Sequence, residues 1–166
     1  GTGFSSKLIL NENPSHTEAE IDTIMKNFMG ISRYIKMNTL PYDQIHHIDM
    51  HIKLLDEETM LVGEYPSGVA DGPQIEANLE YILQNFKTCY GRDYRVVRIP
   101  MPPQNGGYPP NNDYRTYTNS LVINKTVIVP MYELKYDTTA LRIYRNAMPG
   151  YRVVGVDCNQ IIPSLG

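Results

Sequence analysis

The sequence predicts an α/β fold built from repeated units of strand, hairpin turn, strand, helix and strand. An internal repeat carries this prediction, because Tyr94-Arg95-Val96-Val97 recurs as Tyr151-Arg152-Val153-Val154, a spacing of a little under roughly 60 residues. The same succession of apolar alternation, polar turn and helical periodicity precedes both copies. One such unit cannot bury both of its faces, so we expect neighbouring units to pack around a shared axis.

The first complete unit occupies residues 41–101. We predict its strands from alternating or continuous apolar runs, at Ile48 to Leu55, Met60 to Tyr65 and Tyr94 to Ile99. Apolar residues recur at helical spacing from Pro73 to about Thr88, which predicts a helix. Asp71-Gly72-Pro73 is typical of a helix start, because proline is favoured in the first turn. Gly91 is a suitable stop.

A second unit and an incomplete one flank the first. The second, residues 118–166, is predicted to contain three strands and a helix, over Thr118–Ile123, Thr126–Met131, about Asp137–Ala147 and Tyr151–Val156, with a turn at Asn124-Lys125. The incomplete unit, residues 1–40, is predicted as a strand, a helix with a hydroxyl cap and a strand, over Lys7–Leu10, Thr17–Met29 and Ser32–Met37. Glycine and proline exclude helix and central strand from residues 102–117, so this loop faces a substrate or serves as a linker.

Composition and charge argue against some classes of partner. The formal net charge is −3 and no stretch is strongly basic, which argues against a nucleic-acid partner. No apolar run approaches the roughly 18 residues of a membrane span. Residues 1–6 lack the charged start and apolar block of a signal peptide, and the absence of an initial Met leads us to expect missing sequence upstream. Two cysteines cannot form a disulfide framework.

Three of the four histidines fall within Gln44-Ile45-His46-His47-Ile48-Asp49-Met50-His51. On the predicted strand His47, Asp49 and His51 would share one face, about 6.6 Å apart, with Ile48 and Met50 toward the core. Three interpretations compete. The face is simply solvated; or His47, Asp49 and His51 bind zinc or iron; or Asp49 binds a planar cation beside a His47 that transfers protons.

Three motifs resemble the agmatine deiminase and bacterial-type peptidylarginine deiminase family of the pentein superfamily. They are His47-Ile48-Asp49, the hairpin Thr116 to Asn124 with Val127 to Pro130, and Ile9-Leu10-Asn11 with Asn13-Pro14. The resemblance extends over nearly the whole chain. It implies a five-bladed α/β propeller of repeated modules, of which residues 1–166 would form one partial domain.

The resemblance also implies a chemistry. In this family a thiolate attacks the guanidinium carbon, ammonia leaves, and water hydrolyses the covalent thiouronium intermediate. Asp49 would bind the guanidinium, His47 would be the general acid/base, and Asn119 is a weaker candidate for lining the pore, its alternative role being a hydrogen bond at a strand start. No cofactor or metal is implied, and the substrate is a small-molecule or peptide guanidinium. His51 departs from the apolar or aromatic residue expected at its position.

No residue of this sequence is assigned as the nucleophile. The family's catalytic cysteine follows the segment that here ends at Gly166, and its second guanidinium-binding carboxylate lies upstream. Cys89 and Cys158 lack the motif and are interpreted as incidental thiols. We therefore expect the 166-residue chain to be inactive alone. The alternatives are a non-catalytic binding or interaction module of pentein-like fold and a metal-dependent hydrolase. The compartment would be cytoplasmic for an agmatine deiminase and extracellular for a peptidylarginine deiminase.

Overall fold

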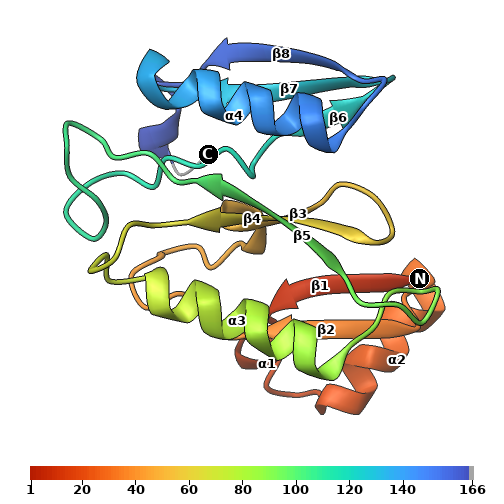
Figure 1. Ribbon diagram of the computed structural model, residues 1–166. Coiled ribbons are helices and arrows are strands. Elements are labelled where there is room, and N and C mark those ends of the chain that lie inside the picture. The colour runs from red at the N-terminus through yellow and green to blue at the C-terminus, as the bar shows by residue number, and fades with distance from the viewer. Residues whose placement is uncertain (165–166) are drawn as a thin grey trace.

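The computed structural model describes residues 1–164, which form three separate β-sheets that follow one another along the chain (Figure 1). Leu165 and Gly166, the last residues of the expected second unit, lie outside the described residues. The mixed α/β fold and the repeated units are as expected. None of the three sheets within residues 1–164 closes on itself.

The first sheet pairs β1 (Thr2–Ser6) with β2 (Arg33–Met37) in parallel. Between them lie α1 (Leu8–Asn11) and α2 (Glu18–Met29), and Thr17 caps α2 in a capping box with Glu20, as the hydroxyl signal predicted. The strand predicted at Lys7–Leu10 is wrong, because the strand lies earlier and these residues begin α1. All five residues of β2 pair with Thr2–Ser6, so the residues after Ser6 have no strand partner in this sheet. They form the short helix α1 instead.

The second sheet has the order β3-β4-β5. Its elements are β3 (Ile52–Leu54), β4 (Thr59–Glu64), α3 (Gly72–Asn85) and β5 (Arg95–Pro100), with a 3₁₀ helix η1 (Ile48–Met50) ahead of them. Proline stands in the first turn of α3, as predicted. The helix ends before Gly91, because Phe86 turns extended and packs against the core.

The third sheet, order β6-β7-β8, repeats the second. It contains β6 (Leu121–Ile123), β7 (Thr126–Met131), α4 (Leu134–Ala147) and β8 (Arg152–Asp157), followed by a 3₁₀ helix η2 (Ile162–Ser164). Asn124 and Lys125 form the predicted turn, both with positive φ. Residues 102–117, where the loop was expected, contain no helix or strand, only an isolated bridge. The strand expected over Thr118–Ile123 is wrong in its first half, because pairing with β7 begins only at Leu121, opposite Ile128.

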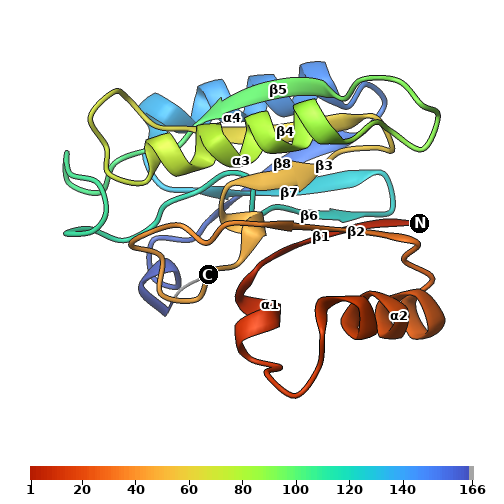
Figure 2. The same cartoon turned by 90° about the horizontal axis from the view of Figure 1, so that it is seen from below.

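The helices α3 and α4 join neighbouring sheets. Helix α3 packs on β4 of its own sheet and on β2 of the preceding sheet, and α4 packs on β7, β8 and on β5 of the preceding sheet. Two cores result, one around Ile82 and Val62 and the other around Tyr144 and Leu61. Figures 1 and 2 show the sheets one after another, with α3 and α4 along the same side. Each strand–helix–strand unit therefore buries its second face only against a neighbour.

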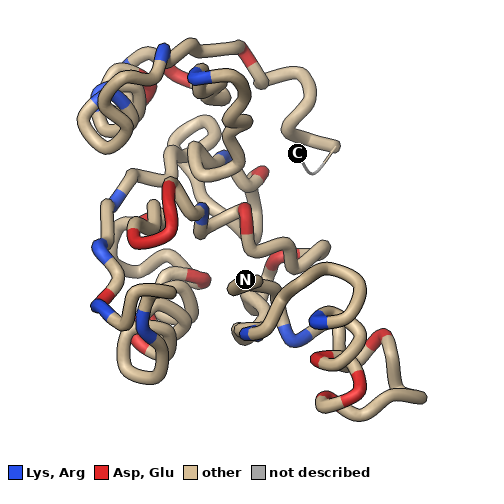
Figure 3. The backbone as a smooth tube through the Cα atoms, turned by 90° about the vertical axis from the view of Figure 1, so that its right-hand side faces the viewer, with Lys and Arg blue, Asp and Glu red and all other residues tan. Residues whose placement is uncertain are grey.

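Basic and acidic residues are both scattered over the backbone, and the most continuous acidic segment is the turn at residues 56–58 (Figure 3). Within residues 1–164 no helix is long and apolar enough to cross a membrane.

Candidate active site

The backbone turns sharply just before His47. His46 has a φ of 55°, a left-handed conformation that few residues other than glycine adopt. His47 is extended, and η1 then carries Asp49 through one tight turn, closed by the Met50 N–H donating to the His47 carbonyl at 3.3 Å. The side chains of both His47 and Asp49 are exposed. This segment therefore presents an imidazole and a carboxylate to the surface.

The expected strand from Ile48 to Leu55 is wrong in its first half. Pairing with β4 begins only at Ile52, opposite Val62, and the Gly63 N–H donates to the His51 carbonyl at the strand's first contact. Earlier residues have no partner strand and form η1 instead. His47, Asp49 and His51 therefore do not share the face of a strand, because strand alternation requires an extended backbone.

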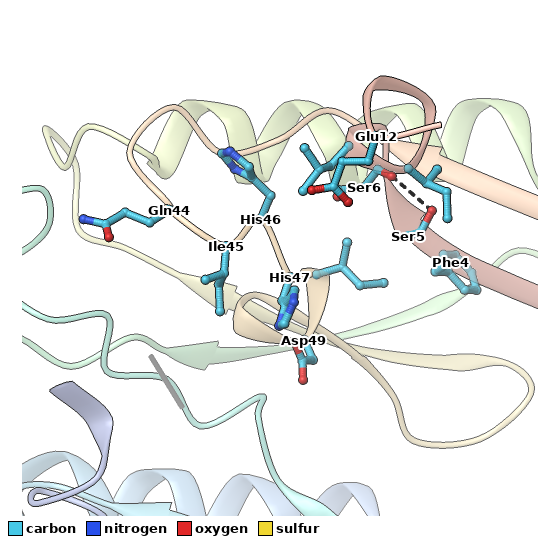
Figure 4. A pocket seen from close by; sticks show the side chains of 12 residues that line it. Phe4, Ser5, Ser6, Glu12, Gln44, Ile45, His46, His47 and Asp49 are labelled. Carbon is cyan, nitrogen blue, oxygen red and sulfur yellow. Dashed lines mark hydrogen bonds between the residues drawn. The ribbon is translucent and has the colours of Figure 1, made fainter. Parts of the chain in front are cut away.

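His47 and Asp49 line one cavity of about 610 Å³. Its walls come from three parts of the chain: β1 with Phe4, Ser5 and Ser6; α1 with Leu8 and Ile9, followed by its C-cap Glu12; and residues 44–49. In Figure 4, His47 and Asp49 point toward the same side of the view, whereas His46 points away from them. Glu12 is a second carboxylate in this lining. It falls inside the Ile9–Pro14 motif, but nothing in its spacing singled it out.

The segment before β6 lies against Asp49. The hydroxyl of Thr118 donates to the backbone carbonyl of Asp49 at 2.7 Å, and the Lys53 ammonium donates to the Ser120 carbonyl at 2.6 Å. Burial lowers the pKa of Lys53, and the nearby carboxylate of Asp49 opposes that shift. Asn119, between these two contacts, is half-buried and does not line the cavity of His47. The fold brings its segment, but not its side chain, to the candidate site.

His51 has a different environment. Its side chain is 2% exposed, and both ring nitrogens are buried with no hydrogen-bond partner among residues 1–164. Burial lowers the pKa of His51 to about 4, because a desolvated imidazole disfavours its charged form. Among residues 1–164 no three His, Cys, Asp or Glu side chains are placed to hold a metal ion. A metal site would need the side chains of His47, Asp49 and His51 to point at one common position, and these three side chains do not come together in this way.

The two thiols lie elsewhere. Cys89 is exposed and lines a separate cavity of about 530 Å³ with Leu54, Tyr94 and Tyr151. Cys158 follows β8 and packs, half-buried, against the second core. As far as residues 1–164 are concerned, the lining of the cavity that holds His47 and Asp49 includes no cysteine.

The sequence of residues 3–166 matches the family model of the Porphyromonas-type peptidyl-arginine deiminases. The chain belongs to this family. Among similar curated proteins, one from Vibrio parahaemolyticus, named as a candidate agmatine deiminase, is 26% identical over 172 residues, which cover 90% of this chain and 47% of the relative. A candidate agmatine deiminase from Shewanella baltica is 23% identical, with 97% of this chain and 48% of the relative covered.

The fold of this chain is also similar to solved structures of deiminases. A candidate arginine deiminase from Porphyromonas gingivalis superposes with a TM-score of 0.84 at 24% identity, covering 98% of this chain and 50% of that one. The agmatine deiminase of C. jejuni gives a TM-score of 0.82 at 23% identity, covering 98% and 48%. The chain thus spans about half the length of the deiminase relatives that it matches.

Proposed function

We propose that this chain carries the guanidinium-binding and proton-transferring part of a deiminase active site. The observation that supports the proposal is the presence of His47 and Asp49, both exposed, in one cavity. A carboxylate binds a guanidinium through charge-assisted hydrogen bonds and fixes the plane of the cation. Asp49 takes this role, and Glu12 stands in the same lining as a second carboxylate.

His47 acts as the general acid and base in this proposal. A thiolate adds to the guanidinium carbon, and the C–N bond to the departing nitrogen breaks once His47 has donated a proton to it. Ammonia departs, and the carbon remains bound to the sulfur as a covalent thiouronium intermediate. Water then gives a proton to His47 and its oxygen to the carbon, the C–S bond breaks, and the ureido product is released with the thiolate restored. No cofactor is required.

The nucleophile of this mechanism is not assigned to Cys89 or Cys158, because neither lines the cavity of His47. We therefore propose that the thiolate comes from a longer protein and that the 166-residue chain does not turn over substrate alone. Release of ammonia from agmatine or an arginine peptide by the purified chain, abolished by thiol alkylation, would contradict this part of the proposal.

We also infer that the three units belong to a propeller of repeated α/β modules, five in a complete protein. The supporting observation is that α3 and α4 each pack between two successive sheets, so the same step can be repeated. The third sheet ends this series with exposed apolar residues, Leu121, Ile123 and Val156. In such a ring the His47 and Asp49 cavity would face the common axis.

Ligand binding tests the proposal directly on the chain. We expect agmatine and acetyl-arginine amide to bind with a Kd on the order of 1 mM, and butylamine, which lacks the guanidinium, to bind at least tenfold more weakly. The Asp49→Asn variant should lose this preference. Asp93→Asn is the matched control, because Asp93 is exposed and pairs with Lys87 away from the cavity. Equal binding of agmatine by the parent and Asp49→Asn would refute the assignment of Asp49.

The second candidate function is a binding module that holds a guanidinium without hydrolysing it. The cavity favours this candidate in one respect, since no thiol of residues 1–164 lines it. A longer natural protein that contains this chain separates the two. Thiol-dependent ammonia release by that protein supports the enzyme, and binding without release supports the module.

A further inference from the structure

The segment that leads to His47 is held from one side by α3. Residues 38–47 form no helix or strand, so their backbone groups need other partners. Asn78, 2% exposed, accepts the Asn38 N–H at 3.2 Å and donates to the Asn38 carbonyl at 2.9 Å. Asp71, fully buried at the start of α3, accepts the Tyr42 N–H at 3.2 Å. The helix thus replaces the strand partner that this segment lacks.

The second oxygen of the Asp71 carboxylate holds a different part of the chain. The hydroxyl of Tyr114, in the loop of residues 101–120, donates to it. Burial raises the pKa of Tyr114, and the bond to Asp71 raises it further, so the hydroxyl keeps the proton that it donates. Four residues later, Thr118 of the same loop donates to the Asp49 carbonyl. Asp71 therefore contacts both segments that meet at the candidate site.

The carboxylate of Asp71 makes these contacts without a basic partner. No Lys or Arg within residues 1–164 forms an ion pair with it. A buried carboxylate that depends on two neutral donors is costly to disturb, since removal of one donor leaves a charged oxygen unsatisfied. Two segments far apart in sequence are thus fastened at a single point.

We propose that Asp71 is a positioning residue for the candidate active site, which it serves by fixing the Tyr42–His47 segment to the Tyr114–Thr118 loop. Asp71 does not line the cavity of His47, so it acts through the backbone of Tyr42 and the hydroxyl of Tyr114. Its effect on ligand binding rests on the function proposed above. Its effect on the geometry of residues 42–47 does not.

The test compares two tyrosine variants of the 166-residue chain. Tyr114→Phe removes the hydroxyl that donates to Asp71 and keeps the ring. Tyr42→Phe is the matched control, because Tyr42 is 49% exposed and reaches Asp71 only through its backbone N–H. Amide hydrogen exchange and the NMR signals of the His47 imidazole are recorded for both, together with Tm.

We expect Tyr114→Phe to speed exchange at Tyr42 and Ile45 at least tenfold and to shift the His47 imidazole signals, with exchange in β7 unchanged. Tyr42→Phe should leave all of these as in the parent. Asp71→Asn, which keeps the shape but not the charge, should give the same local effect. A uniform rise in exchange over the whole chain, or equal effects of the two tyrosine variants, would overturn the proposal by assigning Asp71 a purely structural role.

Agmatine titrations separate this inference from the proposed function. If the parent binds agmatine, Tyr114→Phe should weaken binding several-fold while Tyr42→Phe does not, and unchanged binding by Tyr114→Phe would count against the inference. If the parent does not bind agmatine, the proposed function fails, and the exchange measurements still decide whether Asp71 positions His47.

Discussion

The hydroxyl of Thr118 donates a 2.7 Å hydrogen bond to the backbone carbonyl of Asp49, across 69 residues of sequence. Thr118 is fully buried, and its hydroxyl also lies 2.7 Å from that of Thr116. The bond attaches the loop ahead of the third sheet to the 3₁₀ turn ahead of the second sheet. Asp49 therefore depends on the neighbouring unit for its position.

Thr118→Val tests that dependence. Valine keeps the branched shape and removes the hydroxyl, so we expect a loss of about 1 kcal/mol or somewhat more in the free energy of unfolding. Guanidinium binding should weaken as Asp49 loses its anchor. Thr138→Val is the control, because Thr138 is exposed and bonds only within α4. Titration with agmatine and thermal unfolding measure both effects; unchanged affinity would show that Asp49 needs no support from Thr118.

The buried His51 predicts a pH dependence of stability. Its pKa is about 4 in the folded state and about 6.5 when unfolded, so the unfolded chain binds more protons between these values. Stability should therefore fall as the pH decreases from 6.5 to 4, with a contribution of up to about 1.4 kcal/mol per pH unit. We expect His51→Leu to flatten this part of the curve of Tm against pH.

The exposed His16 supplies the control for that measurement. His16→Gln should leave the pH profile of the parent unchanged. A His51→Leu profile as steep as that of the parent between pH 6.5 and 4 would show that other groups cause the loss of stability.

The hairpin turn between β6 and β7 contains backbone strain. Asn124 and Lys125 have φ values of 46° and 60°, the pattern of a two-residue turn that favours Asn-Gly. Lys125→Gly should raise stability by about 0.5 kcal/mol, since glycine adopts positive φ without steric cost. The gain is reduced by loss of the Lys125 ammonium over the Tyr151 ring, 5.1 Å from its centroid. A lower Tm for Lys125→Gly than for the parent would show that this cation–π contact outweighs the strain.

The outer face of the third sheet tests the propeller proposal. In the repeat, Val156 takes the position of Ile99, yet Val156 is 46% exposed and Ile99 is fully buried near α4. In the 166-residue chain, Val156→Lys should change stability by no more than about 0.5 kcal/mol and should reduce binding of a hydrophobic dye.

Ile99→Lys is the matched variant in the covered sheet and should unfold the chain, because it buries an unpaired charge. In a longer protein that completes the ring, we expect Val156→Lys to become destabilising as well. Equal tolerance of lysine at both positions in the longer protein would count against a neighbouring module over β8.

Local sequence determined the elements whose signals are local. The repeat of Tyr94 to Val97 at Tyr151 to Val154 located β5 and β8, the hydroxyl before Glu18 located the start of α2, and the polar pair Asn124-Lys125 located a turn. Each of these depends on neighbouring residues: apolar alternation, a cap or a left-handed turn. The family resemblance was likewise contained in short motifs, and the match over residues 3–166 confirmed it.

Tertiary structure alone decided the geometry of the candidate site. Alternating apolarity around Ile48 predicts a strand, but a strand needs a partner, and β4 pairs only from Ile52 onward. The residues before it therefore coil into η1, which leaves His47 and Asp49 exposed and buries His51. Contacts such as Thr118 with Asp49 and Tyr114 with Asp71 join residues far apart in the chain. No local pattern encodes such contacts, because they form only when whole sheets pack together.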